Sequence, residues 1–256
     1  MKTSLPQVAG VASVTDESAR VRTLVLDLRL EAAPGQFVMA WLPGLDEKPF
    51  SLVGADPVTL TIARVGPFST AIHALAPGDR LWIRGPLGKP FTLPHTQRPD
   101  SPLAPSLLLI GGGYGVAPLY FLAERALAAG WGATMVIGAQ TAADIVFAGR
   151  FAALGVHLEI TTDDGSLGLQ GVATDAAARL LDDARRQGVA PYQSLYACGP
   201  EPMLDAVERL ARARGMPAQL SYERYMRCGF GVCGSCTRRG WLVCRDGPVK
   251  RVGPDP

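Results

Sequence analysis

The chain is poor in histidine and cysteine, and its charges almost cancel. Its 256 residues include three histidines and five cysteines, and the formal net charge is +2. A balance so close to neutral gives no reason to expect nucleic acid or an anionic surface as a partner. The histidines, His73, His95 and His157, have no metal-ligand spacing. We therefore interpret them as surface or packing residues.

The sequence also lacks signs of hydrolytic chemistry and of export. It has no Ser/His/Asp arrangement, no suggestive pair of carboxylates, no internal repeat and no low-complexity tract. The first twenty residues hold no apolar run of signal-peptide length, so we expect a soluble, cytoplasmic protein. Residues 101–123 carry no charge, but prolines and the triplet Gly111-Gly112-Gly113 interrupt them. A buried strand, a glycine turn and a helix explain this run better than a membrane span.

Four of the five cysteines are crowded near the C-terminus. The segment "RCGFGVCGSCTRRGWLVC" has the spacing C-x4-C-x2-C, followed by a fourth cysteine. The cysteines are Cys228, Cys233, Cys236 and Cys244. Glycines stand between the first three of them and allow a backbone to wrap closely around a bound group.

Three interpretations of this cluster compete. Disulfides should be rare without a secretion signal, and cysteines this close would form strained loops. A structural zinc site usually shows two short cysteine pairs separated by a longer loop, and only Cys233 and Cys236 are two residues apart. The spacing is that of a plant-type [2Fe–2S] cluster, except for the short last gap. We favour an iron–sulfur cluster appended to a larger protein.

The first hundred residues favour β-structure. Alternating or short apolar segments at residues 22–30, 36–42, 58–65 and 79–85 are separated by Gly/Pro turns. Several short strands with frequent turns predict a small antiparallel β-barrel. A proline-rich polar stretch at residues 93–105 follows and is a candidate linker.

The pattern then changes to alternating strands and helices. Strands are expected at residues 106–110, 133–139, 156–162, 194–199 and 218–223, and helices at 119–129, 142–153, 173–187 and 202–214. Such alternation predicts a doubly wound parallel sheet. The expected fold is thus an α+β multidomain chain: a barrel at residues 1–100, an α/β domain at 105–222 and a small cluster segment at 223–256.

Four further motifs each allow two interpretations. "GGGYGVAP" at residues 111–118 is either a phosphate-binding turn or an ordinary strand–helix junction. "CGPEPM" at residues 198–203 lies at a strand end where ligands bind, but its cysteine also suits a buried packing position. "KPFSLVG" at 48–54 is either a flavin-binding or a plain strand. In "VGPFSTAIHAL", at 65–75, Ser69 and Thr70 are either phosphate donors or helix caps.

The order of these motifs carries a resemblance. K-P-F-S, V-G-P-F-S-T, G-P-L-G, G-G-G-Y-G-V-A-P, T-D-D-G-S, C-G-P-E-P-M and the string "ERYMRCGFGVCGSC" follow one another. The chain resembles the ferredoxin-reductase-like flavoproteins over roughly residues 8 to 249. Among them it is similar to the electron-transfer subunits of type B dihydroorotate dehydrogenase.

The resemblance implies three cofactors: FAD on the barrel, NAD on the α/β domain and a [2Fe–2S] cluster. The FAD residues it implies are Lys48, Pro49, Phe50, Ser51, Gly66, Ser69 and Thr70. On the NAD side it implies Gly112, Gly113, Gly115, Asp164, Cys198, Gly199 and Met203. Cys228, Cys233, Cys236 and Cys244 match the cluster ligands. The family usually has arginine where Lys48 stands, so the bidentate grip on the pyrophosphate is lost here.

The resemblance also implies a heteromeric oxidoreductase of pyrimidine biosynthesis. Electrons would pass from the FMN of a catalytic subunit through the cluster and FAD to NAD, with the two kinds of subunit forming a heterotetramer. This chain has no convincing base for dihydroorotate, so it should not oxidise that substrate alone. Two alternatives stay open: an NAD(P)H-linked subunit of a ferredoxin, hydrogenase, sulfide or sulfite reductase, and a zinc-stapled nucleotide-sensing module.

Overall fold

The computed structural model describes residues 5–94, 106–188 and 192–254. By its internal contacts the chain forms two units. One comprises Met1–Phe91 and Glu223–Val249, and the other comprises Thr92–Tyr222 and Lys250–Pro256. The cysteine segment thus belongs to the same unit as the N-terminal strands. Most of the candidate linker at 93–105, and His95 with it, lies outside the described residues.

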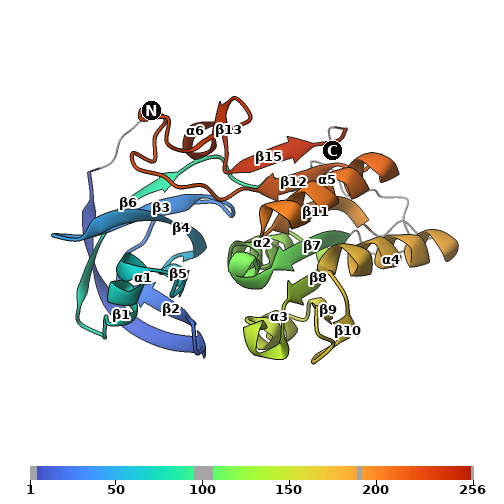
Figure 1. Cartoon of the computed structure of the whole chain (residues 1–256), viewed down its shortest axis with the longest axis horizontal. Coiled ribbons are helices and arrows are strands. Elements are labelled where there is room, and N and C mark those ends of the chain that lie inside the picture. Colours follow the sequence, from blue (N-terminus) through green and yellow to red (C-terminus); the bar gives the residue numbers. More distant parts are fainter. Residues whose placement is uncertain (1–4, 95–105, 189–191, 255–256) are drawn as a thin grey trace. The chain divides into compact units, whose positions relative to one another are not determined.

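The first unit contains a closed antiparallel barrel of six strands, as the alternating segments predict (Figure 1). The strands are β1 (Gln7–Ser18), β2 (Val21–Leu26), β3 (Phe37–Leu42), β4 (Asp46–Ala55), β5 (Val58–Ala63) and β6 (Arg80–Leu87). They run around the barrel in the order β1-β2-β5-β4-β3-β6. β1 was not predicted, because its second half is polar and mostly exposed. It closes the barrel by pairing with both β2 and β6.

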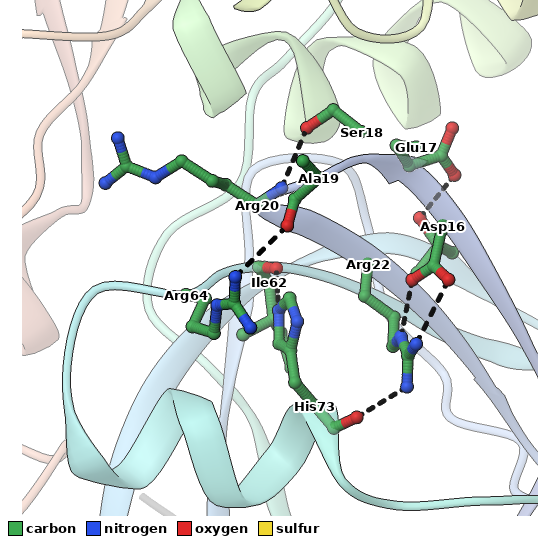
Figure 2. Close-up of polar contacts among 10 residues, drawn as sticks. Asp16, Glu17, Ser18, Ala19, Arg20, Arg22, Ile62, Arg64 and His73 are labelled. Atoms are coloured by element: carbon green, nitrogen blue, oxygen red, sulfur yellow. Dashed lines mark hydrogen bonds and ion pairs between the residues drawn. The ribbon is translucent and has the colours of Figure 1, made fainter.

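A short helix, α1 (Pro67–His73), is fastened to the barrel by its last residue. The ring of His73 bonds through Nε2 to the Ile62 carbonyl oxygen at 2.8 Å. Arg22 donates to the His73 carbonyl oxygen and, through Nε, to Asp16 at 2.7 Å (Figure 2). The hydrogen bond from Arg22 holds the pKa of the exposed Asp16 carboxyl below its usual range. His73 is therefore a packing residue, as expected.

The second unit is built on a sheet of seven strands in the order β10-β9-β8-β7-β11-β12-β15. These are β7 (Ser106–Gly112), β8 (Gly132–Ala139), β9 (His157–Thr162), β10 (Leu169–Gln170), β11 (Tyr192–Cys198), β12 (Ala218–Ser221) and β15 (Val249–Val252). Every pairing from β10 to β12 is parallel. The predicted doubly wound fold is confirmed.

Helices connect these parallel strands (Figure 1). They are α2 (Val116–Ala128), α3 (Ala148–Ala153), α4 (Ala173–Arg186) and α5 (Glu201–Arg214). Right-handed crossovers place α2 and α3 on one face of the sheet and α4 and α5 on the other, because the strand order reverses at β7. Among the described residues no helix is long and apolar enough to cross a membrane.

The helix expected over residues 142–153 is broken in two. A 3-10 turn, η2 (Ala142–Asp144), is followed by α3, and Phe147 between them has a left-handed backbone with φ of 67°. That conformation interrupts a helix, and Phe147 adopts it while its side chain is buried. The apolar periodicity of the segment does not reveal the break.

A clamp around Thr92 ties the chain entering the second unit to its sheet. The buried Gln219 accepts a bond from Thr92 N at 2.9 Å and donates to its carbonyl oxygen at 2.6 Å. Tyr196 donates to the same oxygen at 2.7 Å, and Arg251 donates to the Thr92 hydroxyl. Residues from β11, β12 and β15 thus meet at one residue. Burial raises the pKa of Tyr196 to about 12.

Replacing Tyr196 by Phe should lower the free energy of unfolding by about 1–2 kcal/mol, because one buried hydrogen bond is lost. The pH dependence should change as well. The phenol ionises more readily when unfolded, so its contribution is complete below about pH 10 and is lost as pH rises toward about 12. Denaturant unfolding near pH 8 and near pH 11 checks this. Equal loss of stability in both proteins between those values would contradict it.

Candidate functional site

Strand β4 and the start of α1 bring two of the motifs together. Lys48, Pro49, Phe50 and Ser51 lie on β4, opposite residues Phe37–Ala40 of β3. The ring of Phe50 stacks on that of Phe68 with centroids 6.2 Å apart and planes 18° apart. K-P-F-S and V-G-P-F-S-T therefore form one surface of the barrel, although the turn and strand of residues 56–63 separate them in sequence.

Ser69 and Thr70 differ in what their hydroxyls do. Ser69 is buried, accepts bonds from the backbone N–H groups of Val65 and Gly66 at 2.9 and 3.0 Å, and donates to the Gly66 carbonyl oxygen. Its only O–H donor is thus used inside the loop. Thr70 is exposed, and a side chain at Gly66 would meet no atom within 4 Å. Space for a ligand therefore exists beside Gly66, with Thr70 as the better donor.

Lys48 is engaged by neighbours from two directions. Its Nζ lies 2.5 Å from Asp46 Oδ2 and 4.9 Å from the centroid of the Tyr225 ring. The ion pair holds the pKa of the Asp46 carboxyl below its usual range. Tyr225 comes from the C-terminal segment, and no local sequence pattern connects it with Lys48. The Lys48 cation is therefore held against the cysteine segment.

On the second unit, the glycines of G-G-G-Y-G and C-G-P-E-P-M pack the two motifs against each other. A Cβ at Gly112 would lie 2.7 Å from Pro200 and 2.9 Å from the sulfur of Met203. A Cβ at Gly115 would lie 2.4 Å from the Cys198 carbonyl oxygen. Gly199, whose φ is 158°, approaches Gly112 equally closely. The close packing of the carboxyl ends of β7 and β11 therefore requires glycine at these positions.

Gly113 differs from the other glycines of this turn in having open space beside it. Gly113 has a left-handed φ of 54°, and nothing lies within 4 Å of the position of its missing Cβ. It is the one glycine of this turn that opens to space.

Asp164 lies apart from the glycine turn. It follows β9, two strands away from β7, and accepts bonds from the backbone and hydroxyl of Ser166 at 3.0 and 2.6 Å. Those bonds keep its pKa below the usual range.

The cysteine loop belongs to the barrel unit and turns on three glycines. Gly229, Gly231 and Gly234 all have positive φ, at 76°, 90° and 75°. Only glycine adopts this region readily, so the spacing of glycines between the cysteines is a backbone requirement. A hairpin of β13 (Thr237–Arg238) and β14 (Trp241–Leu242) follows, and α6 (Val243–Asp246) carries Cys244.

The four thiols lie as two pairs. Cys236 and Cys244 are both 2% exposed, with sulfurs 3.3 Å apart. Cys228 and Cys233 share a hydrogen bond at the outer side of the loop, where Cys233 is exposed. All five cysteines are free, and 3.3 Å is far longer than a disulfide bond of about 2.05 Å. The disulfide interpretation is therefore wrong.

The two pairs have opposite electrostatic surroundings. Hydrogen bonds from Ser235 lower the pKa of Cys233 to about 6. Burial acts against the Cys228 thiolate, but backbone N–H groups of the loop outweigh it and lower that pKa too. Burial and the neighbouring Cys236 raise the pKa of Cys244 to about 12. The Cys244 sulfur therefore needs a cationic centre if it is to be a thiolate.

Hydrogen bonds of Asp246 fix the C-terminal end of the cysteine loop, near Cys244. Asp246 accepts a bond from Leu242 N at 2.9 Å and pairs with Arg245, which lowers the Asp246 pKa to about 2. Arg238, in the hairpin that follows the third cysteine, is buried. Trp241 is half-buried, and its ring lies against Gly247.

The sequence has close relatives among characterised protein families. Residues 223–252 match the model of the iron–sulfur cluster binding domain of dihydroorotate dehydrogenase B. A probable dihydroorotate dehydrogenase B (NAD(+)) electron transfer subunit from Methanothermobacter thermautotrophicus is 41% identical over 96% of this chain and 89% of its own length. The one from Thermococcus kodakarensis is 40% identical over 95% of each chain. The chain belongs to this family of electron transfer subunits.

Solved structures agree with this family assignment at the level of fold. The structure described as an NADH-dependent reduced ferredoxin–NADP oxidoreductase has a TM-score of 0.81 and is 28% identical, covering 96% of this chain and 88% of that one. The FAD/NAD binding domain of a nitric oxide dioxygenase from Vibrio cholerae has a TM-score of 0.65 at 22% identity, covering 82% and 94%. The second likeness shows the fold alone.

As an electron transfer subunit of this family, the chain has a donor set that fits an iron–sulfur cluster. Among the described residues, no three His, Cys, Asp or Glu side chains lie so that they could hold one metal ion. A zinc site needs four ligands around one point, whereas two irons take two thiolates each. The arrangement in pairs thus favours the [2Fe–2S] interpretation over structural zinc.

Serine in place of Cys233 or Cys236 should remove the iron and leave most of the flavin, because the barrel surface of β4 and α1 does not depend on the thiols. Iron and flavin contents of the purified variants measure this. Cys198→Ser is the matched control and should keep its iron, since Cys198 lies at the end of β11 in the other unit. Normal iron in both cluster variants would end the cluster assignment.

The segment after β8 bears on the choice of nucleotide. NADP enzymes of this fold class place Arg or Lys near the 2′-phosphate, and residues 140–149 contain neither. Asp144 accepts from Thr141 at 2.9 Å, and Ala142 N donates to Ser166, the partner of Asp164. The exposed carboxylates of Asp144 and Asp164 thus lie at this edge of the sheet, where they would repel a 2′-phosphate.

NADH should therefore be preferred over NADPH in steady-state reduction of an artificial acceptor. We expect a ratio of kcat/KM values above about tenfold, which corresponds to about 1.4 kcal/mol. A more than tenfold preference for NADPH would show that the 2′-phosphate is recognised elsewhere.

Proposed function

We propose that this chain is the electron transfer subunit of an NAD-linked dihydroorotate dehydrogenase B, an oxidoreductase of pyrimidine biosynthesis. The family assignment at about 40% identity over most of the chain supports this role. The single structural observation that carries it is the paired set of four cysteines on the barrel unit. Iron–sulfur clusters held by four thiolates transfer single electrons.

The cofactors divide the work. When bound, FAD exchanges two electrons with NAD and single electrons with the cluster. It can therefore link a two-electron carrier to a one-electron carrier. We propose that β4 and the loop at Gly66 hold the flavin, that the turn at Gly113 receives the nucleotide, and that Cys228, Cys233, Cys236 and Cys244 hold the cluster. Lys48, Pro49, Phe50, Ser51 and Thr70 would contact FAD, and Ser69 would shape the loop.

Packing glycines and strand-end residues have supporting roles on the nucleotide side. Gly112, Gly115 and Gly199 let the β7 and β11 ends approach, and Cys198 and Met203 line that contact. Asp164 stands at the edge beyond β8. We propose that all of these residues belong to the NAD site, and that Gly112, Gly115 and Gly199 form its floor.

The chain needs a partner to complete the reaction. The sequence shows no convincing base for dihydroorotate. We therefore propose that a catalytic subunit containing FMN oxidises that substrate and passes electrons to the cluster. We further propose that the two kinds of subunit form a cytoplasmic heterotetramer.

The exposed side of the cysteine loop is the proposed docking face. Val232 is 76% exposed, Tyr225 and Cys233 are exposed, and Arg227 is exposed beside them. Exposed arginines also occur on ordinary solvated edges, but arginine and tyrosine are enriched at interfaces. Trp241 is a candidate anchor at the rim, or a shield that keeps water from the cluster.

The alternative keeps the cofactors and changes the partner. The likeness to the NADH-dependent reduced ferredoxin–NADP oxidoreductase structure favours it as a second candidate, because that protein is built on the same fold over nearly the whole chain. A ferredoxin or another redox protein would then take the place of the catalytic subunit.

The isolated chain should reduce artificial acceptors with NADH but should not oxidise dihydroorotate. Adding the catalytic subunit should restore dihydroorotate-dependent NAD reduction. Trp241→Ala should weaken that coupled reaction more than the artificial one, because only the former needs the docked complex. Steady-state rates with and without the added subunit measure both effects.

Dihydroorotate oxidation by the chain alone, or no effect of the added subunit, would show that the partner and role are wrong. Efficient coupling to ferredoxin in place of the catalytic subunit would favour the alternative.

A further inference from the structure

Arg84 lies outside every sequence motif, yet several partners hold its side chain beside the cysteine loop. It stands on β6 opposite Met39 of β3, and its side chain is 11% exposed. A guanidinium so far removed from water must be compensated by fixed partners.

Those partners come from two distant parts of the chain. Nε and one terminal nitrogen of Arg84 donate to the two carboxylate oxygens of Glu47 at 3.0 and 2.8 Å. The same terminal nitrogen donates to the Cys228 carbonyl oxygen at 2.9 Å. The guanidinium carbon also lies 5.5 Å from the centroid of the Phe230 ring. Glu47 immediately precedes the K-P-F-S motif on β4.

The loop packs on the same outer face of the barrel. Paired residues of neighbouring strands share a face, so Met39 and Arg84 point the same way. Met39 is fully buried, and a Cβ at Gly229 would lie 2.9 Å from its side chain. The turn after Cys228 therefore covers Met39, and Arg84 stands beside it.

The bond from Arg84 sets the orientation of the first turn of the loop. With the Cys228 carbonyl oxygen directed to the guanidinium, the amide N–H groups of Phe230, Val232 and Cys233 are directed to the Cys228 sulfur. The Val232 N to Sγ distance is 3.4 Å. One peptide group thus turns its acceptor toward the barrel while the following amides turn their donors toward the first thiol.

We propose that Arg84, braced by Glu47, is a positioning residue that holds the Cys228 turn in the orientation that gives the cluster its reduction potential. The inference rests on the proposed cluster at the four cysteines. It adds a residue of the barrel, on β6, to the determinants of electron transfer.

Two physical effects lead to the same direction of change. Hydrogen bonds to cysteine sulfur and nearby positive charge both favour the reduced cluster, which carries one more electron. Losing Arg84 weakens both, so the potential should fall. Lysine keeps the charge but cannot donate to two carboxylate oxygens and a carbonyl from one planar fork.

A purely structural ion pair would behave differently. It would change the stability of the barrel but leave the potential and the spectrum of a retained cluster unchanged. Arg80, on the same strand, is exposed and lies four residues away, about 13 Å along the strand. Arg80→Gln removes the same charge from β6 without touching the loop and is the matched control.

The test is an anaerobic redox titration of the full chain followed by electron paramagnetic resonance, with iron release to a chelator as a second readout. Arg84→Gln should shift the cluster potential downward, change the g-values and release iron several-fold faster. Arg84→Lys should have an intermediate potential. Arg80→Gln should match the wild type. If Arg84→Gln retains no cluster, Arg84→Lys supplies the potential.

Wild-type potential and iron release in Arg84→Gln would overturn the proposal, as would a wild-type potential in Arg84→Lys or an equal shift in Arg80→Gln. These outcomes are separate from a failure of the proposed function. Wild-type protein without iron would refute the cluster itself, and no step of the test needs dihydroorotate or a partner subunit.

Discussion

The attachment of the cysteine loop to the outer face of the barrel is the constraint on which the first unit depends. Gly229 packs on Met39, the Tyr225 ring covers Lys48, and Arg84 joins Glu47 to the Cys228 carbonyl. Each contact joins the C-terminal segment to β3, β4 or β6. Because β4 also carries K-P-F-S, the proposed flavin surface and the four cysteines lie within one unit and are joined by a few side-chain contacts.

The second unit follows a different principle. Its motif glycines are explained mostly by close approach of neighbouring atoms, with Gly112, Gly115 and Gly199 leaving no room for a side chain. Within the G-G-G-Y-G turn, only Gly113 combines a left-handed backbone with open space. The Thr92 clamp then holds the entering chain and β15 to the sheet. Closely packed strand ends beside the open position at Gly113 are consistent with the proposed NAD site.

Much of this organisation could be predicted from the sequence, but not all of it. Alternating or short apolar segments predicted four of the six barrel strands, β2, β3, β5 and β6, and the strand–helix alternation predicted the parallel sheet, because both are local patterns. β1 was missed because half of it is polar, and the left-handed Phe147 broke a helix that periodicity alone supports. Cysteine spacing predicted an iron–sulfur cluster segment, in agreement with the family model that matches residues 223–252. It could not reveal Arg84, which contacts Cys228 across 144 residues of sequence.

The side chains around the cofactors were harder to predict than the motifs themselves. The resemblance gives Ser69 as an FAD residue, yet its hydroxyl is used within the loop, and Arg238 is buried although it carries a charge. Both results depend on tertiary packing, which no sequence spacing encodes.

The central claim is that electrons from NADH reach a cluster on these cysteines through a flavin on the same chain. Anaerobic titration of the purified chain with NADH, followed by electron paramagnetic resonance, tests it directly. A signal from a reduced cluster of two irons should appear only when flavin is bound. No such signal in flavin-replete protein, or zinc in place of iron, would contradict the claim.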